Sequence, residues 1–173
     1  MSRIVLVTGT DTGVGKTWIS CGLLRRWRAD GLRVAARKPA ETGCEERGGI
    51  LHASDAAALA EAAGGGEAAD RVCRLRYAEP LAPAVAADRA GRPIDTRAIV
   101  GECRERARDV DLLLVEGAGG LLVPLSGRET FADLAVALGA RLVVVVGARL
   151  GAINHAMLTI EAARGRGLEV AAV

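Results

Sequence analysis

Aromatic residues are scarce in this sequence of 173 residues, which has two Trp, one Tyr and one Phe. A core must therefore be built from Ala, Val, Leu and Ile, and this composition suits helices packed on a buried sheet. Apolar runs of about 18 residues are also lacking, so we expect no membrane span and no membrane partner. The chain enters a strand-like run at once, without a signal-peptide pattern, which predicts a cytoplasmic protein.

Lysine is equally scarce, since the 23 Lys and Arg residues include only two lysines, Lys16 and Lys38. The formal net charge of +2 does not favour nucleic acid as a partner. Lys differs physically from Arg, because it carries a compact charge on a flexible stem rather than a planar fork. The places of the two lysines in the fold therefore decide whether their retention is chance or function.

Disulfide and zinc patterns are lacking too. The cysteines form no C-x-x-C pair, and the two histidines lie too far apart in the sequence to suggest a metal site. We expect ordinary core or surface roles for the four cysteines: Cys21, Cys44, Cys73 and Cys103.

Strand-like and helical patterns alternate along the chain. Apolar runs predict strands at residues 3–8, 32–36, 111–115, 142–146 and 168–173. Helical patterns lie at residues 16–31, 54–63, 96–108, 131–138 and 153–164. This order predicts an α/β fold with three layers, a parallel sheet with helices on both faces, in one domain over residues 1–173. Residues 40–50 and 77–93 are expected to be loops, and the most hydrophobic run, 142–146, is expected to lie at the sheet centre.

The strongest motif is G-T-D-T-G-V-G-K-T at residues 9–17, which follows a strand and opens a helix. In this setting backbone N–H groups and the helix N-terminus converge on phosphate oxygens. Lys16 would reach the β- and γ-phosphates, and the Thr17 hydroxyl would ligate Mg²⁺. Five residues, not the usual four, separate Gly9 from Gly15. The motif predicts a nucleotide site and a fold of the P-loop NTPase type.

Two further charged residues stand at the predicted ends of strands. Lys38 closes the second strand before Pro39, and Glu116 ends the apolar run L-L-L-V. The carboxyl edge of a parallel sheet is where ligands bind, so both side chains are expected beside the phosphate loop. A carboxylate at a buried strand end is costly unless it is paired or faces a metal, which favours a metal-binding role for Glu116.

Two weaker signals leave alternatives open. Asp55 follows Ser54 at a helix start, where a capping role explains it as well as a metal-binding one. The stretch from Gly151 to Asn154 opens another helix and would suit an anion, but a plain helix start is the simpler interpretation.

Taken together, these stretches resemble the dethiobiotin synthetase family. The matching stretches are residues 9–17, R-K-P-A-E-T-G at 37–43, S-D at 54–55, V-E-G-A-G-G at 115–120 and V-V-G-A-R-L-G-A-I-N-H-A-M-L at 145–158. The similarity runs from residue 2 to the last residue, and the long phosphate loop is itself a family trait. The resemblance implies an ATP- and Mg²⁺-dependent ring closure, in which 7,8-diaminononanoate takes up CO₂ and forms dethiobiotin, ADP and phosphate.

The resemblance also implies roles for individual residues. Catalytic roles fall to Lys38, Lys16 and Thr12. ATP binding falls to Gly13, Val14, Gly15, Lys16, Thr17, Trp18, Asp55, Glu116, Gly117, Ala118 and Gly119. The metal ligands are Thr17, Asp55 and Glu116. Substrate binding falls to Thr12, Lys38, Thr42, Gly151 and Asn154, the last two acting from the neighbouring subunit of a homodimer.

One departure from the family concerns the C-terminus. Family members usually continue beyond this point, so we expect that one or more C-terminal strands of the fold are missing and that the segment that contacts adenine lies outside the chain. Two related ATPases and a catalytically inactive module remain alternatives. A partitioning ATPase carries a signature lysine five positions before the loop lysine, where this chain has Asp11. A relative of the cobyrinic acid diamide synthase type would carry a glutaminase extension.

Overall fold

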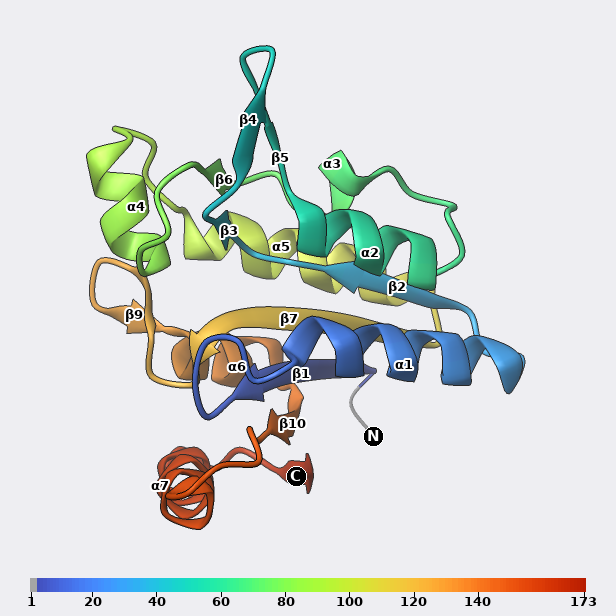
Figure 1. Ribbon diagram of the computed structural model, residues 1–173. Coiled ribbons are helices and arrows are strands. Elements are labelled where there is room, and N and C mark those ends of the chain that lie inside the picture. Colours follow the sequence, from blue (N-terminus) through green and yellow to red (C-terminus); the bar gives the residue numbers. More distant parts are fainter. Residues whose placement is uncertain (1–2) are drawn as a thin grey trace.

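A computed structural model describes residues 3–173 (Figure 1). Its centre is a five-stranded parallel sheet with the order β11-β10-β1-β7-β2. The strands are β1 (Ile4–Gly9), β2 (Val34–Arg37), β7 (Leu112–Gly120), β10 (Arg141–Val145) and β11 (Val170–Ala172). The larger helices are α1 (Lys16–Ala29), α2 (Ser54–Ala62), α5 (Thr96–Arg108), α6 (Phe131–Leu138) and α7 (Ala152–Arg164).

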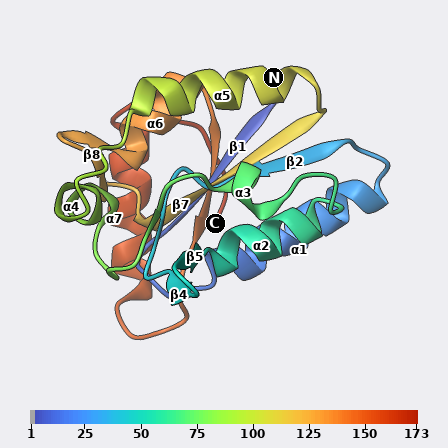
Figure 2. The ribbon, with the colours of Figure 1, turned by 90° about the horizontal axis from the view of Figure 1, so that it is seen from above.

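Helices cover both faces of this sheet, as the alternating pattern predicts. Figure 2 shows α5 and α6 on one side of the strands and α1 and α2 on the other. Successive side chains of a strand point to opposite faces, so Leu6 packs with the α5–α6 layer whereas Val7 packs with the α1–α2 layer. Leu113 and Leu114 divide between the two layers in the same way. The three-layer α/β architecture is therefore confirmed.

The sheet centre lies one strand away from where the sequence placed it. Hydrophobicity favoured residues 142–146, but β1 occupies the middle, between β10 and β7. All six residues of β1 are buried, whereas two of the five residues of β10 are only half-buried. Mean hydropathy does not separate a central strand from its neighbour when helices cover both.

Short elements fill the two segments that were expected to be loops. Residues 40–50 contribute to β3 (Glu41–Thr42) and to a hairpin of β4 (Glu45–Arg47) and β5 (Ile50–His52). Gly48 and Gly49 form its two-residue turn with φ of 60° and 81°, which matches the Gly-Gly hairpin signal that composition alone overlooked. Residues 77–93 contain α4 (Pro83–Arg89), which begins with Pro at a position where its missing N–H costs nothing. The remaining short elements are α3 (Ala69–Val72), β6 (Arg76–Tyr77), β8 (Pro124–Ser126) and β9 (Glu129–Thr130).

Local sequence signals explain the helix ends on the α5–α6 face. Asp95 caps α5 by accepting the N–H groups of Arg97 and Ala98. Thr130 and Asp133 form a capping box at the start of α6. Both helices begin where the sequence predicts. The four cysteines are free and buried, which agrees with an ordinary core role. Among the helices of residues 3–173, none has both the length and the apolar character that a transmembrane helix requires.

Phe131 anchors α6 to the sheet and provides a test of the packing. Its side chain is fully buried in the cluster that contains Leu113 and Leu134. We expect Phe131→Ala to lower the free energy of unfolding by about 3–5 kcal/mol through lost burial and the cavity left behind. Val136, half-exposed on the same helix, provides the control, and Val136→Ala should change stability by less than about 0.5 kcal/mol. Urea denaturation measures both, and equal effects would contradict the assigned core.

Candidate active site

The phosphate loop lies between β1 and α1, at the carboxyl edge of the sheet. Gly15 is the N-cap of α1 and has φ of 98°, a left-handed conformation that side chains disfavour. It provides no side-chain cap, so the first N–H groups of α1 remain directed at the space in front of the helix. Backbone N–H groups and the positive end of the helix dipole therefore favour an anion here.

Asp11 holds this loop in shape through three contacts. Its carbonyl oxygen accepts a hydrogen bond from Lys16 Nζ at 2.8 Å, and its carboxylate accepts the Thr12 N–H at 2.7 Å. Arg149 Nη2, in the segment before α7, forms an ion pair with the other carboxylate oxygen. The hydrogen bond from Arg149 is the main cause of the lowered pKa of Asp11. In the sequence Asp11 only replaced a signature lysine, whereas in the fold it links the phosphate loop to the start of α7.

Lys38 lies at the end of β2, buried between two carboxylates. Its Nζ is 2.6 Å from Asp55 Oδ2 and 2.6 Å from Glu116 Oε1, and the residue is 4% exposed. Burial disfavours the ammonium, but Glu116 and Asp55 outweigh this effect and raise the pKa of Lys38 above its ordinary value. Lys38 is therefore a permanent cation near neutral pH. Burial and the neighbouring Lys38 charge lower the pKa of Lys16.

Glu116 is fully buried and joins the two lysine-bearing elements. Its Oε1 accepts hydrogen bonds from Lys38 and, at 2.9 Å, from Thr17 Oγ1. Its Oε2 is buried with no hydrogen-bond partner among residues 3–173. A buried carboxylate oxygen without a partner is costly, and it is suited to a cation. In the same residues no cluster of three His, Cys, Asp or Glu side chains could hold a metal alone, so a metal here would need the Thr17 hydroxyl, water or nucleotide oxygens as well.

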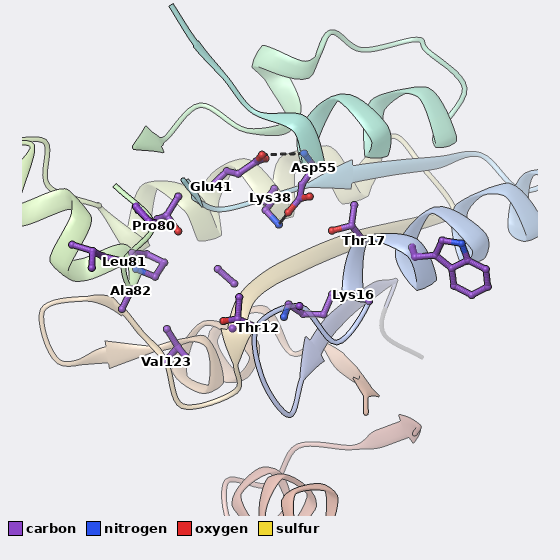
Figure 3. Close-up of a pocket in the computed structure, with 17 residues that line it drawn as sticks. Thr12, Lys16, Thr17, Lys38, Glu41, Asp55, Pro80, Leu81, Ala82 and Val123 are labelled. Carbon is purple, nitrogen blue, oxygen red and sulfur yellow. Dashed lines mark hydrogen bonds and ion pairs between the residues drawn. The ribbon is translucent and has the colours of Figure 1, made fainter. Parts of the chain in front are cut away.

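One cavity of about 510 Å³ is lined by Lys16, Thr17, Lys38 and Asp55, among others (Figure 3). One wall is the phosphate loop and the start of α1, where Lys16 faces Lys38 and Asp55 across the space. Thr17 and Lys38 meet at Glu116 Oε1, to which both donate. The opposite end is formed mostly by residues before and within α4 and by the segment after β7: Pro80, Leu81, Ala82, Pro83 and Val123. The cavity thus joins a charged end to an apolar end, which suits a ligand with an anionic head and a hydrocarbon chain.

Most residues singled out in the sequence meet at this cavity. Those that line it are Thr12, Gly13, Gly15, Lys16, Thr17, Trp18, Lys38, Thr42, Asp55, Ala118 and Gly119. Glu116 lies behind the wall and reaches it through Lys38 and Thr17. Val14 and Gly117 do not line the cavity, and Gly151 and Asn154 are exposed at the start of α7 outside it. Sequence reasoning missed the apolar end, which carries no motif, and Glu41, which lies within the family stretch 37–43 but was given no role.

The expected cap of α2 was wrong in its identity. Capping was one of the two roles open to Asp55, but the N-cap is Ala53, which has no side chain suited to capping. Glu41 from β3 accepts the N–H groups of Asp55 and Ala56 instead. The capping interpretation of Asp55 therefore falls away, and its carboxylate is left for Lys38.

Comparison with known proteins places the chain in a family. The model of an AAA domain family, AAA_26, matches residues 3–173. The ATP-dependent dethiobiotin synthetase BioD of Anaeromyxobacter dehalogenans (strain 2CP-C) is 48% identical over 171 residues, which cover 99% of this chain and 75% of the relative. The protein of the same name from Pseudomonas aeruginosa (strain UCBPP-PA14) is 47% identical over 166 residues, or 95% of this chain and 73% of the relative. The chain belongs to the ATP-dependent dethiobiotin synthetase family.

As a dethiobiotin synthetase, the chain is an ATP-dependent ligase of biotin biosynthesis. The predicted family is thereby confirmed, against the partitioning and diamide synthase alternatives. Solved structures support the fold alone. The kinase domain of Escherichia coli tyrosine kinase ETK has a TM-score of 0.53 and 15% identity over 98% of this chain and 65% of that domain. The chimerical protein CapA2B2 has a TM-score of 0.55 and 12% identity over 98% of this chain and 74% of that protein.

Proposed function

We propose that the cavity between Lys16 and Lys38 is where this dethiobiotin synthetase closes a cyclic urea on 7,8-diaminononanoate. The observation that carries the proposal is the pair of buried lysines, the only two in the chain, on the wall of one cavity. Carbamate and triphosphate are both anions, and their approach in a site shielded from water requires fixed cations. An Arg-rich chain that keeps Lys at these two positions meets this requirement.

ATP is proposed to bind with its phosphates on the phosphate loop. Gly13, Gly15 and Thr17 would contribute backbone N–H groups, and Lys16 would leave Asp11 O to contact the γ-phosphate. Of the remaining family positions, Trp18, Ala118 and Gly119 line the cavity and would surround the phosphates and ribose, whereas Val14 and Gly117 do not line it. Lys16 supplies charge at the oxygens where it accumulates during transfer.

Mg²⁺ is proposed to bind to Thr17, Asp55 and Glu116. The unpartnered Oε2 of Glu116 and the two hard-oxygen side chains beside it fit a magnesium ion, which prefers carboxylate, hydroxyl and phosphate oxygens. When bound with ATP, such an ion neutralises phosphate charge. Glu116 and Asp55 would hold it on the Lys38 side of the cavity, opposite Lys16.

The diamine is proposed to lie with its chain against the apolar end of the cavity. Pro80, Leu81 and Val123 would exclude water from the methylene groups, each of which contributes about 0.8 kcal/mol on burial. Thr12 and Thr42 would hydrogen-bond to the amines and the carbamate, with Lys38 as the nearest cation. This arrangement brings the carbamate oxygen towards the γ-phosphate.

The chemistry then follows in balanced steps. One amine adds CO₂ and releases a proton, giving a carbamate. A carbamate oxygen attacks the γ-phosphorus, the bond from phosphorus to the ADP oxygen breaks, and ADP leaves. The second amine attacks the carbonyl carbon and loses a proton, the bond from carbon to the phosphate oxygen breaks, and phosphate leaves with the urea ring closed. Lys16 and Lys38 stabilise the charge that moves between carbamate and phosphate, and Thr12 and Thr42 orient the reacting groups.

A homodimer is proposed to complete the substrate site through α7. Large apolar side chains are exposed on and before this helix: Leu150, Ile153, Met157 and Leu158. An exposed apolar patch of this kind supports a surface that is buried in the assembled protein. Gly151 is the N-cap of α7 with φ of 92° and no side-chain cap, so the helix start is open to the substrate carboxylate of the neighbouring subunit.

The dimer is tested by a charge placed in the apolar patch. Ile153→Asp should convert the dimer into a monomer, because a carboxylate in an apolar interface is left without a partner. Sedimentation velocity measures the mass, and exposed Val85→Asp on α4 serves as the control that keeps the dimer. An Ile153→Asp protein that remains dimeric would exclude α7 as the interface.

The reaction itself is tested by ADP release. We expect ADP to form at a rate that requires both diaminononanoate and bicarbonate, since the carbamate is the attacking group. An analogue with a single amine should still form a carbamate, but it has no second amine to close the urea ring and should give no cyclic product. ADP release that is unaffected by omission of either substrate would contradict the proposed function.

A further inference from the structure

Glu41 is a buried carboxylate in the wall of the cavity that none of the proposed steps uses. It is 5% exposed and lies on β3, next to Thr42. A carboxylate buried to this extent is costly unless hydrogen bonds or a counter-charge compensate it. A side chain retained against this cost needs a structural explanation.

Its contacts lead to the N-terminus of α2. Oε1 accepts the Asp55 N–H at 2.9 Å and lies 3.5 Å from Ser54 Oγ, while Oε2 accepts the Ala56 N–H at 3.0 Å. Figure 3 shows Glu41 directed at the start of this helix, with the bond to Asp55 marked. Helix α2 has Ala53 at its N-cap and no cap of its own, so Glu41 caps it from 14 residues away.

Asp55 is thereby held at two points. Glu41 fixes its backbone N–H, and Lys38 contacts its carboxylate at 2.6 Å. The contacts continue from Lys38 to Glu116 and from Glu116 to Thr17, so Glu41 stands at the outer end of the group proposed to hold the metal. The Asp55 side chain is 39% exposed and would otherwise be free to turn towards solvent.

We infer that Glu41 is a positioning residue, which caps α2 so that the Asp55 carboxylate stays aimed at Lys38 and at the cation of the site. This inference rests on the proposed function, in which Asp55 is a metal ligand. An ordinary Ser, Thr or Asp at the N-cap would satisfy the helix N–H groups at less cost. A carboxylate from β3 also connects α2 to the strand that carries Thr42. The proposed metal ligand Asp55 and the proposed substrate-binding residue Thr42 are thereby held in a fixed relative position.

The test compares Glu41→Gln with a substitution of another carboxylate that caps a helix. Asp95 caps α5 with two N–H contacts and does not line the cavity, so Asp95→Asn removes the same kind of interaction without touching the site. Both variants should lower Tm. Only Glu41→Gln should also weaken Mn²⁺ binding in the presence of ADP, by about 10-fold or more, the usual effect of disturbing a residue that orients a ligand.

Mn²⁺ affinity is measured by calorimetry on the full chain well below Tm, so that loss of folding does not enter. If Glu41→Gln proves too unstable, Glu41→Asp, which keeps the charge on a shorter side chain, should show the same direction of change. Asp55→Asn separates the positioning role of Glu41 from the proposed metal site. Weakened Mn²⁺ binding in Asp55→Asn with unchanged binding in Glu41→Gln or Glu41→Asp would overturn the positioning role alone. Unchanged binding in Asp55→Asn would overturn the metal site of the proposed function as well.

Discussion

Lys38→Arg is expected to lower kcat by about 10²–10³-fold, the usual loss when one charge-stabilising donor is misplaced. Lys38 Nζ fits between Asp55 Oδ2 and Glu116 Oε1 in a space that leaves 4% of the residue exposed. A guanidinium keeps the positive charge, but it is planar, larger and fixed in its fork geometry, so it cannot place one nitrogen between both carboxylates. The KM for ATP should change little, because Lys16 and the phosphate loop are untouched.

Steady-state kinetics with ATP and diaminononanoate varied in turn separate these effects. Arg26→Lys is the matched control, since Arg26 is an exposed residue of α1 whose side chain is 75% accessible. This exchange of one cation for another should leave kcat unchanged. A Lys38→Arg enzyme that turns over at near the unmodified rate would show that the position needs only a positive charge.

Glu116→Gln is expected to reduce activity more than Lys38→Arg does. It should lower kcat/KM by at least about 10³-fold, the upper end of the losses seen when one charge-stabilising group is removed. The change removes the negative charge that faces Lys38 and replaces one of the two carboxylate oxygens, of which Oε2 has no partner in the described residues, by an NH2 group. At the Oε2 position the NH2 group cannot bind a cation, and at the Oε1 position it would face Thr17 and Lys38, which are themselves donors. The substitution therefore weakens metal binding and disturbs Lys38 at the same time.

Titration of activity with Mg²⁺ measures the first of these consequences. The curve for Glu116→Gln should shift to higher Mg²⁺ and reach a lower plateau. Exposed Glu129→Gln on β9 changes the same functional group away from the cavity and should do neither. An unshifted Mg²⁺ curve in Glu116→Gln would remove Glu116 from the proposed metal ligands.

Sequence reasoning succeeded where the structural cause is local. The phosphate loop and the start of α1 follow from nine consecutive residues, and α6 spans Phe131–Leu138 as its helical pattern predicts. Lys38 and Glu116 stand at the ends of apolar runs, and parallel strands bring such ends to one edge of the sheet. Two residues 78 positions apart could therefore be expected near one another, and they form an ion pair.

It failed where the cause is a contact between distant segments. Glu41 looks like an ordinary polar residue of a loop, because its partners on α2 lie 14 and 15 residues further on. The apolar end of the cavity combines Pro80–Pro83 with Val123, and no pattern in either segment refers to the other. The position of β1 at the sheet centre is likewise set by strand order, which hydrophobicity does not encode.

Transfer of oxygen from bicarbonate to phosphate tests the central claim most directly. If a carbamate oxygen attacks ATP in this cavity, turnover with fresh ¹⁸O-labelled bicarbonate should place one labelled oxygen in each phosphate released. A second labelled oxygen should remain in the carbonyl group of dethiobiotin. Mass spectrometry at times short against exchange with water measures both, with inorganic phosphate incubated without enzyme as the control. Dethiobiotin formed alongside unlabelled phosphate would contradict the account. The urea ring would then have closed without any bond between a carbamate oxygen and the γ-phosphorus.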